Sequence, residues 1–344
     1  MKIAMVTPLF YPVTGGTEVH VLNLSRALAK LGHEVEVHTT SNTYTERDVL
    51  PRYEELDGVK VIRDPATWRV KDVDVVHIHN FYRMLSRWNL KTLYFGYFGR
   101  LPKVFTPHDS FIKDRPLPVR LLQREFVKRV DRWIAVSKWE LEEMRKRGFR
   151  TDNAVVIGNG VEDSAFDLPR QEPVIKGEYL AFIGRISPEK NQAMAIQCAK
   201  LAKVKLVLAG DVRDEKYFEE IKQYFNEDVT YLGKVDERTK YSLIDNALAL
   251  VLTSKIEAEP IVVKEALVRG TPVIITPTTG GALEHVRDGY NGFVVRDCEE
   301  FKRAVNEVRA RRDEFSRHAR EGTERFKWEN VAREVEKVYK EITR

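Results

Sequence analysis

The stretch that decides the fold reads Tyr179-Leu180-Ala181-Phe182-Ile183-Gly184-Arg185-Ile186-Ser187-Pro188-Glu189-Lys190-Asn191. Its apolar half predicts a buried strand, and the Ser followed by Pro favours a helix that begins at Ser187-Pro188. Lys190 would then lie in the first helical turn, where a cation is unfavourable unless an anion binds beside it. Arg185 lies on the connecting loop, near the same free backbone N–H groups. Two cations and free amides at such a turn indicate a diphosphate site, and two solvated surface cations are the alternative.

Strand-like runs alternate with helix-like runs on both sides of this stretch, and most of the strands are apolar without alternation. That pattern is typical of parallel sheets that helices cover on both faces. A segment rich in proline and charge, residues 162–177, is interpreted as a linker. The length of 344 residues also favours two domains. We therefore expect an α/β protein with two facing Rossmann-like domains, at residues 1–165 and 178–325, and a cleft between them.

Composition and charge exclude several classes of protein. No apolar stretch approaches the ~18 residues that cross a bilayer. Cys198 and Cys298 follow no disulfide or metal-ligand pattern, which suggests a reducing, cytoplasmic setting. No stretch resembles a nucleic-acid-binding module, so we expect no nucleic-acid partner.

One segment is both basic and aromatic. Residues 83–132 carry twelve Lys and Arg against four Asp and Glu, a net charge of +8, among many aromatic side chains. Such a face would suit an anionic acceptor or an anionic membrane surface, with peripheral association on the inner face of the cell membrane. The alternative is a set of ordinary helices with solvated cations and aromatic side chains in the core.

Polar and glycine-rich residues follow the predicted strands at their carboxyl ends, where ligands bind in open α/β sheets. They include Gly15-Gly16, His108-Asp109, Asn159-Gly160, Gly210 and Gly280-Gly281. A glycine pair that opens a helix lets backbone N–H groups approach a phosphate or a sugar closely, although double glycines also occur in plain turns. The clustering of these residues at one edge of each sheet is the strongest physical sign of a site.

Two acids in the second half stand out by their context. Glu257 directly follows an apolar strand, and Glu265 lies about one turn into an apolar helix that begins at Pro260. Carboxylates in these places can accept hydrogen bonds from sugar and ribose hydroxyls. The alternative is a solvated loop acid and a helix acid that pairs with a lysine.

Three histidines lie at or near strand ends. His108 could hydrogen-bond a sugar hydroxyl or act as a base, because imidazole changes charge near neutral pH, or it could form a local pair with Asp109. His77 and His79 lie in or just after a strand, with no third ligand nearby in the sequence at metal spacing. We interpret these two as structural and expect no metal site.

Taken in order, these motifs resemble the large family of retaining glycosyltransferases that includes glycogen and sucrose synthases and bacterial lipid mannosyltransferases, which have the GT-B fold. The resemblance covers nearly the whole chain and is carried by Gly15-Gly16-Thr17-Glu18, His108-Asp109, Asn159-Gly160-Val161, Gly184-Arg185 with Lys190-Asn191, Gly210, Gly233, Glu257 to Glu265, and Gly280-Gly281 with Glu284. It implies transfer of a hexose from a nucleotide-diphosphate sugar, with retention of configuration and without a metal or other cofactor. The acceptor stays open between lipid-linked, saccharide and small-molecule classes. A hydrolysing nucleotide-sugar 2-epimerase on the same fold is the alternative.

The resemblance also implies roles for individual residues. Arg185 and Lys190 would bind the donor diphosphate and offset the charge of the leaving group, while Glu265 would hold the ribose. Glu257 and His108 would contact the transferred sugar. Further donor contacts would come from Gly15, Gly16, Gly233, Val235, Ile261 and Val262, and acceptor contacts from Glu18, His108 and Asp109. The catalytic set is therefore His108, Arg185, Lys190 and Glu257.

Two further expectations follow from the resemblance. Glu284 would order the loop of the second glycine pair, and the C-terminal helix within residues 326–344 would pack back on the first domain. The chain also departs from the family, which usually has Glu-Gly-Phe-Gly where this sequence reads Glu257-Ala258-Glu259-Pro260. Pro260 removes one N–H at the helix start, but the amides of Ile261 and Val262 remain, so an unusual donor specificity is expected.

Overall fold

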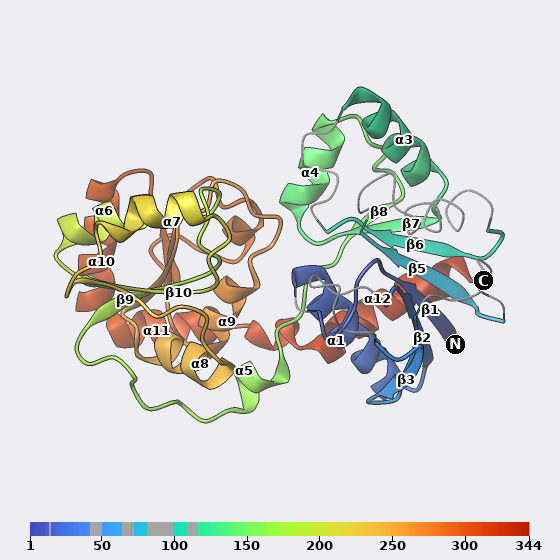
Figure 1. Cartoon of the computed structure of the whole chain (residues 1–344), viewed down its shortest axis with the longest axis horizontal. Helices are drawn as coiled ribbons and strands as arrows, with labels where there is room; N and C mark the ends of the chain where they lie inside the picture. Colours follow the sequence, from blue (N-terminus) through green and yellow to red (C-terminus); the bar gives the residue numbers. More distant parts are fainter. Residues whose placement is uncertain are drawn as a thin grey trace. The chain divides into compact units, whose positions relative to one another are not determined.

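The computed structural model of the protein describes residues 1–13, 15–41, 50–63, 70, 72–80, 99–108 and 116–343. The chain divides into two compact units (Figure 1). The first unit comprises Met1–Gly160 together with Phe326–Arg344, and the second comprises Val161–Arg325. Residues 161–165, which the sequence prediction gave to the first domain, therefore belong to the second unit.

The first unit is built on an eight-stranded sheet in the order β3-β4-β2-β1-β5-β6-β7-β8. Its strands are β1 (Lys2–Val6), β2 (Glu34–Thr39), β3 (Tyr53–Leu56), β4 (Val59–Arg63), β5 (Val75–His79), β6 (Lys103–Thr106), β7 (Arg132–Ala135) and β8 (Ala154–Val156). All neighbours pair in parallel except β3, which runs antiparallel to β4. The expected parallel sheet is confirmed, with one antiparallel edge strand added.

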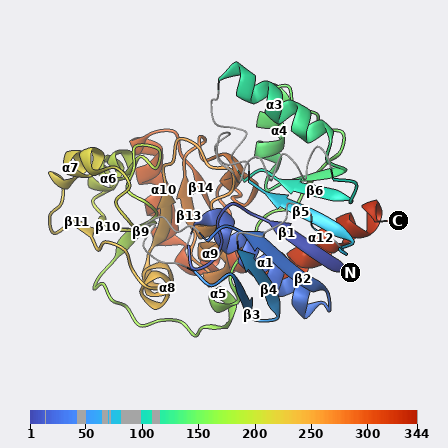
Figure 2. The same ribbon diagram turned by 45° about the vertical axis from the view of Figure 1, so that its right-hand side comes forward.

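Two helices distant in sequence share the core of the first unit. Helix α1 (Gly16–Lys30) packs against α12 (Trp328–Ile342) next to the strands β1, β2 and β4 (Figure 2). Both helices bury apolar side chains together with those of these strands. Trp328, at the start of α12, lies so close to Gly160 that a Cβ on that glycine would overlap the indole. On the other strands, α4 (Lys138–Lys146) contacts β7 and β8, and α3 (Leu117–Lys128) precedes β7.

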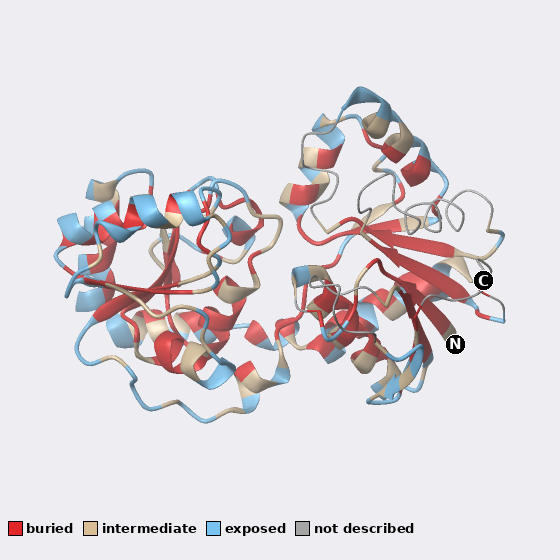
Figure 3. Cartoon of the chain, viewed as in Figure 1, coloured by how far each residue is buried: buried red, intermediate tan, exposed pale blue. Residues whose placement is uncertain are grey.

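The second unit is built on a six-stranded parallel sheet in the order β11-β10-β9-β12-β13-β14. Its strands are β9 (Tyr179–Ile183), β10 (Lys205–Ala209), β11 (Val229–Tyr231), β12 (Ala249–Leu252), β13 (Val273–Ile275) and β14 (Gly292–Val294). Its helices are α5 (Asp163–Asp167), α6 (Gln192–Ala202), α7 (Glu215–Lys222), α8 (Glu237–Asn246), α9 (Ile261–Arg269), α10 (Cys298–Ala310) and α11 (Arg312–Arg320). Helices α6, α7 and α10 cover one face and α8, α9 and α11 the other, so the strands are buried and the outer helix faces are exposed (Figures 1 and 3).

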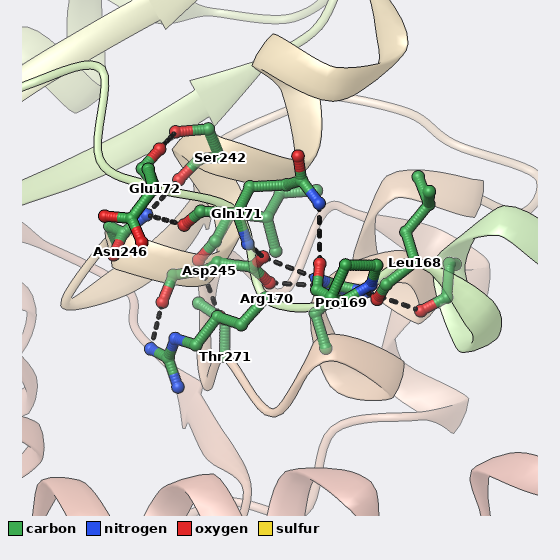
Figure 4. A network of polar contacts seen from close by, with 12 residues as sticks. Leu168, Pro169, Arg170, Gln171, Glu172, Ser242, Asp245, Asn246 and Thr271 are labelled. Atoms are coloured by element: carbon green, nitrogen blue, oxygen red, sulfur yellow. Dashed lines mark hydrogen bonds and ion pairs between the residues drawn. The ribbon is translucent and has the colours of Figure 1, made fainter.

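The segment predicted as a linker is in fact attached to the second unit. Residues 163–167 form α5, and the chain that follows runs along α8 (Figure 4). The Gln171 amide donates to the Asp245 carboxylate at 2.8 Å, and the Asn246 side chain donates to the Gln171 carbonyl at 3.0 Å. Backbone N–H and C=O groups of this extended segment thus form hydrogen bonds with side chains of α8, although the segment pairs with no strand that the structure describes.

Two other expectations from the sequence are wrong. Helix α6 does not begin at Ser187-Pro188 but at Gln192, after Asn191 adopts a left-handed conformation with a φ of 56°. Cys198 and Cys298 form a disulfide that joins α6 to α10, with the Cα atoms 4.5 Å apart. Because these two helices lie side by side on one face of the sheet, residues one hundred positions apart meet, which sequence spacing does not reveal.

Candidate functional site

The strand order of the second sheet marks a place for a ligand. From β9 the chain continues to β10 on one side of it, whereas β12 lies on the other side of β9. The strand order therefore reverses between β9 and β12, and this place is the topological switch point of the sheet. Ligands of open parallel sheets bind outside the carboxyl ends of the strands at this point. The loop with Arg185 and Lys190 follows β9, and the loop with Glu257 follows β12.

Lys190 and Glu257 meet at this switch point. Their side chains form an ion pair that is mostly buried, with 18% of the lysine and 13% of the glutamate side chain exposed. The two loops are also tied through their backbones, because the Lys255 amide donates to the Glu189 carbonyl at 2.8 Å. The Thr253 hydroxyl donates to the Asn191 carbonyl at 2.8 Å. Lys190 therefore has a fixed position, although it lies in the turn before α6 and not in the helix itself.

Arg185 lies on the turn that follows β9, five residues before Lys190. Its side chain is exposed, and within the described part of the chain no side chain pairs with its guanidinium. Its carbonyl accepts a hydrogen bond from the Gln192 side chain at 2.8 Å. Gly210, with a φ of 145°, lies against the same turn so closely that a Cβ there would overlap the Gly184 carbonyl. The backbone of the turn is thus held while the cationic head of Arg185 stays available to an anion.

Glu265 is buried and pairs with a lysine. Its carboxylate accepts from Lys240 at 2.6 Å and from the Tyr241 hydroxyl at 3.4 Å. Burial disfavours the charged form of Lys240, but the adjacent Glu265 carboxylate outweighs this and raises the pKa of the lysine. The pairing expected under the alternative interpretation is therefore present, but the acid is only 6% exposed and is not a solvated helix acid.

The other predicted donor residues surround the same edge of the sheet. The Gly281 amide donates to the Glu257 carbonyl at 3.1 Å, which joins the second glycine pair to the acidic loop. Gly280 to Glu284 form a short 3-10 helix, and Glu284 is exposed. Ile261 and Val262 open α9, and the Gly233 carbonyl accepts from the Gly210 amide at 2.8 Å. Val235 follows β11, two residues before α8 begins.

Sequence reasoning missed the partner of Glu259. This carboxylate, whose side chain is 1% exposed, forms an ion pair with Lys264 and also contacts His285 Nε2 at 3.4 Å. Burial lowers the pKa of Lys264, and the neighbouring Glu259 opposes that shift. A lone lysine in the apolar start of α9 was the available signal, because a buried cation needs a counter-charge. The change from the family pattern at Glu259 is therefore accompanied by a buried cation five residues later.

The first sheet places several predicted residues at its own switch point, between β1 and β5. Gly15 caps α1 and Gly16 begins it, while Glu18 is buried in its first turn, which raises the pKa of this carboxyl. His108 follows β6 and lies 3.1 Å from His79, measured between His108 Nε2 and His79 Nδ1. Burial lowers the pKa of both imidazoles well below the usual value. Asp109, predicted at the acceptor, lies outside the described residues.

A third histidine joins these two, contrary to the expectation from the sequence. His20, on α1, approaches His108 with ring centroids 4.5 Å apart, and its Nδ1 donates to the Asn159 side-chain oxygen at 2.6 Å. Asn159 follows β8 and belongs to the Asn159-Gly160-Val161 motif. His77 is structural, as predicted, because it is hydrogen-bonded to the Tyr339 hydroxyl at 2.6 Å and to the Thr106 hydroxyl at 2.8 Å.

Two family models match the chain in sequence. The model for Glycosyltransferase Family 4 matches residues 14–165, and the model for Glycosyl transferases group 1 matches residues 166–325. The chain belongs to the group 1/family 4 glycosyltransferases. Members of this family transfer a sugar from a nucleotide-sugar donor, and this chain is such an enzyme.

Individual relatives agree with this assignment over their full length. An uncharacterised glycosyltransferase of Methanocaldococcus jannaschii is 28% identical, over 99% of this chain and 98% of its own. A phosphatidyl-myo-inositol mannosyltransferase of Mycolicibacterium smegmatis is also 28% identical, over 100% of this chain and 94% of its own. The solved structure of HepE from Anabaena, in complex with UDP-glucose, superposes with a TM-score of 0.77 at 18% identity and covers 99% of this chain and 100% of its own. The last likeness shows the fold, which is GT-B.

Proposed function

We propose that the second unit of this glycosyltransferase binds a nucleotide-diphosphate sugar at the carboxyl edge of its sheet, with Arg185 and Lys190 on the diphosphate. The observation that carries the proposal is the Lys190–Glu257 ion pair at the β9–β12 switch point. The two cations stabilise the charge that develops on the leaving diphosphate, so transfer requires no divalent metal. Glu257 then accepts hydrogen bonds from the transferred sugar, and Glu265 from the ribose.

The group that is transferred is a hexose, and its configuration is retained. The amides of Ile261 and Val262 at the start of α9 add donors for the diphosphate or the sugar, and the backbone at Gly233 and Val235 meets the base. Gly16, at the start of α1, lies against the phosphates or the acceptor. A thermal-shift screen with UDP, GDP and ADP sugars identifies the base, since only the matching donor stabilises the folded enzyme at low concentration.

The first unit is proposed to bind the acceptor, with His108 at the transferred sugar and Glu18 and Asp109 at the acceptor. The similarity to a phosphatidyl-myo-inositol mannosyltransferase and the net charge of +8 in residues 83–132 support an anionic or lipid-linked acceptor. None of the described helices is long and apolar enough to span a membrane. Sedimentation with anionic vesicles at low salt tests the lipid proposal, and absence of binding there would contradict it.

Turnover of matched variants tests the donor site. Lys190→Ala and Glu265→Ala should each lower kcat/KM by ~10²-fold or more, because charge stabilisation and positioning are lost. Lys205→Ala and Glu227→Ala are the controls. Both residues are exposed in the same unit, and they lie at the edge of the sheet opposite the proposed site, because Lys205 begins β10 and Glu227 lies two residues before β11. Near-wild-type rates in both site variants would refute the site. Formation of epimerised nucleotide sugar in the absence of an acceptor would refute transfer as the reaction.

A further inference from the structure

Three imidazoles from three separate elements, two of them buried and that of His108 half-buried, converge in the first unit. They belong to His20 on α1, His79 at the end of β5 and His108 after β6. One ligand nitrogen from each can be chosen so that all three lie within 4.8 Å of one another. We propose that this cluster, the His20–His79–His108 site, binds one divalent transition-metal ion of the zinc class. The proposal concerns the first unit alone and does not rest on the donor chemistry proposed for the second.

The nitrogen spacing fits a metal of this kind. A tetrahedral zinc ion, with Zn–N bonds of about 2.0–2.1 Å, places neighbouring ligand nitrogens about 3.3 Å apart. His79 Nδ1 and His108 Nε2 are already 3.1 Å apart. The rings of His20 and His79 have their centroids 5.4 Å apart, as do those of His79 and His108. Small rotations of the imidazoles bring the third nitrogen into the same coordination sphere.

The groups around the cluster orient the rings as the outer shell of a metal site does. Because the Asn159 oxygen accepts from His20 Nδ1, the lone pair of this ring is on Nε2. Behind His79, the ring of His77 lies with its centroid 4.0 Å away and is itself held by Tyr339 and Thr106. His79 is fully buried, and its Nδ1, which faces His108 Nε2, is the nitrogen that would bind the ion.

The chemistry of the three donors selects the ion. Imidazole nitrogen suits Zn²⁺, Co²⁺, Ni²⁺ and Cu²⁺, whereas Mg²⁺ and Ca²⁺ prefer oxygen ligands. Three protein ligands leave a fourth position open for water or for a group of a bound molecule. The same ion would fix His108 relative to α1 and β5.

The test is a titration of the chelator-treated full chain with Co²⁺, followed by visible absorption, and with Zn²⁺, followed by calorimetry. We expect one ion per chain, an intense tetrahedral Co²⁺ spectrum and no uptake of Mg²⁺. His20→Gln and His108→Asn should each weaken Zn²⁺ binding by at least 100-fold. Asn suits position 108 because the backbone there has a φ of 49°, a region that Asn tolerates. His33→Gln is the control, because His33 lies in the same unit but pairs with Glu336.

Two results would overturn the proposal. One is the absence of a tetrahedral Co²⁺ spectrum in the wild type. The other is Zn²⁺ binding that His33→Gln weakens as much as the site variants do, which would indicate an adventitious surface site. Circular dichroism of each variant shows whether it folds, and if His20→Gln does not, His108→Asn on its loop carries the test.

Discussion

The buried Glu259–Lys264 pair gives the sharpest prediction of stability. The side chains are 1% and 2% exposed, so Glu259→Gln would leave the Lys264 ammonium in the interior without its partner charge. Removal of one member of a buried pair typically costs 3–5 kcal/mol, because the remaining charge keeps its desolvation penalty, so we expect a loss of about 4 kcal/mol. Replacement of both residues, as in Glu259→Leu with Lys264→Met, should instead recover most of that loss.

Chemical denaturation of the wild type, Glu259→Leu, Lys264→Met and the double variant measures this coupling as a double-mutant cycle, and Glu259→Gln is measured beside them. Glu219→Gln is the control, because its partner Lys222 is exposed and such a pair contributes about 0–1 kcal/mol. The pH dependence adds a second readout. Since burial lowers the pKa of Lys264 below that of the unfolded chain, the unfolded state binds more protons, and Glu259→Gln should regain stability as pH rises. A Glu259→Gln variant within 1 kcal/mol of the wild type would refute the reasoning.

Three more predictions follow from particular contacts. Cys198→Ser with Cys298→Ser should lower the free energy of unfolding by about 2–5 kcal/mol in denaturant, because the disulfide closes a loop of 100 residues; equal stability of the wild type with and without reductant would contradict this. Gly210→Ala should weaken donor binding at least tenfold in calorimetry, since its Cβ overlaps the carbonyl of Gly184 and displaces the Arg185 turn, whereas Gly177→Ala, where a Cβ meets no neighbour, should not. Burial lowers the pKa of His77, His79 and His108 in the folded protein, so below about pH 6.5 the unfolded chain takes up protons that the folded chain does not. The free energy of unfolding, measured in the presence of a chelator, should therefore decrease with falling pH by up to about 1.4 kcal/mol per pH unit for each of the three. A free energy of unfolding that stays constant down to about pH 5 would contradict neutral imidazoles in the folded protein.

Much of the fold could be predicted because its signals are local. The strand Lys205–Ala209 is a short apolar run, and the helix Glu237–Asn246 follows Asp236, whose carboxylate caps the helix; both signals can be read from the sequence. Local signals did not predict the start of a helix or the presence of a strand where contacts with distant parts of the chain determine the structure. The left-handed Asn191 postpones α6 past Ser187-Pro188, and the antiparallel strand Tyr53–Leu56 alternates between exposed and half-buried residues without an apolar run.

The candidate site shows the same division. Its residues could be chosen because polar groups at the carboxyl ends of parallel strands share one edge, and the structure does bring Lys190 to Glu257. The partners of Glu265 and His108 could not be chosen, because Lys240 and His20 lie in other helices at positions that carry no special spacing. The packing of those helices determines which acid or imidazole each of them meets.

The central claim is that Arg185 and Lys190 hold the diphosphate of a sugar donor at the β9–β12 switch point. Calorimetric titration of the preferred nucleotide sugar into the wild type, Arg185→Ala, Lys190→Ala and Lys205→Ala tests it most directly. We predict that the two site variants each bind the donor at least tenfold more weakly, about 1.4 kcal/mol, while Lys205→Ala binds like the wild type. Unchanged donor affinity in both Arg185→Ala and Lys190→Ala would contradict the claim.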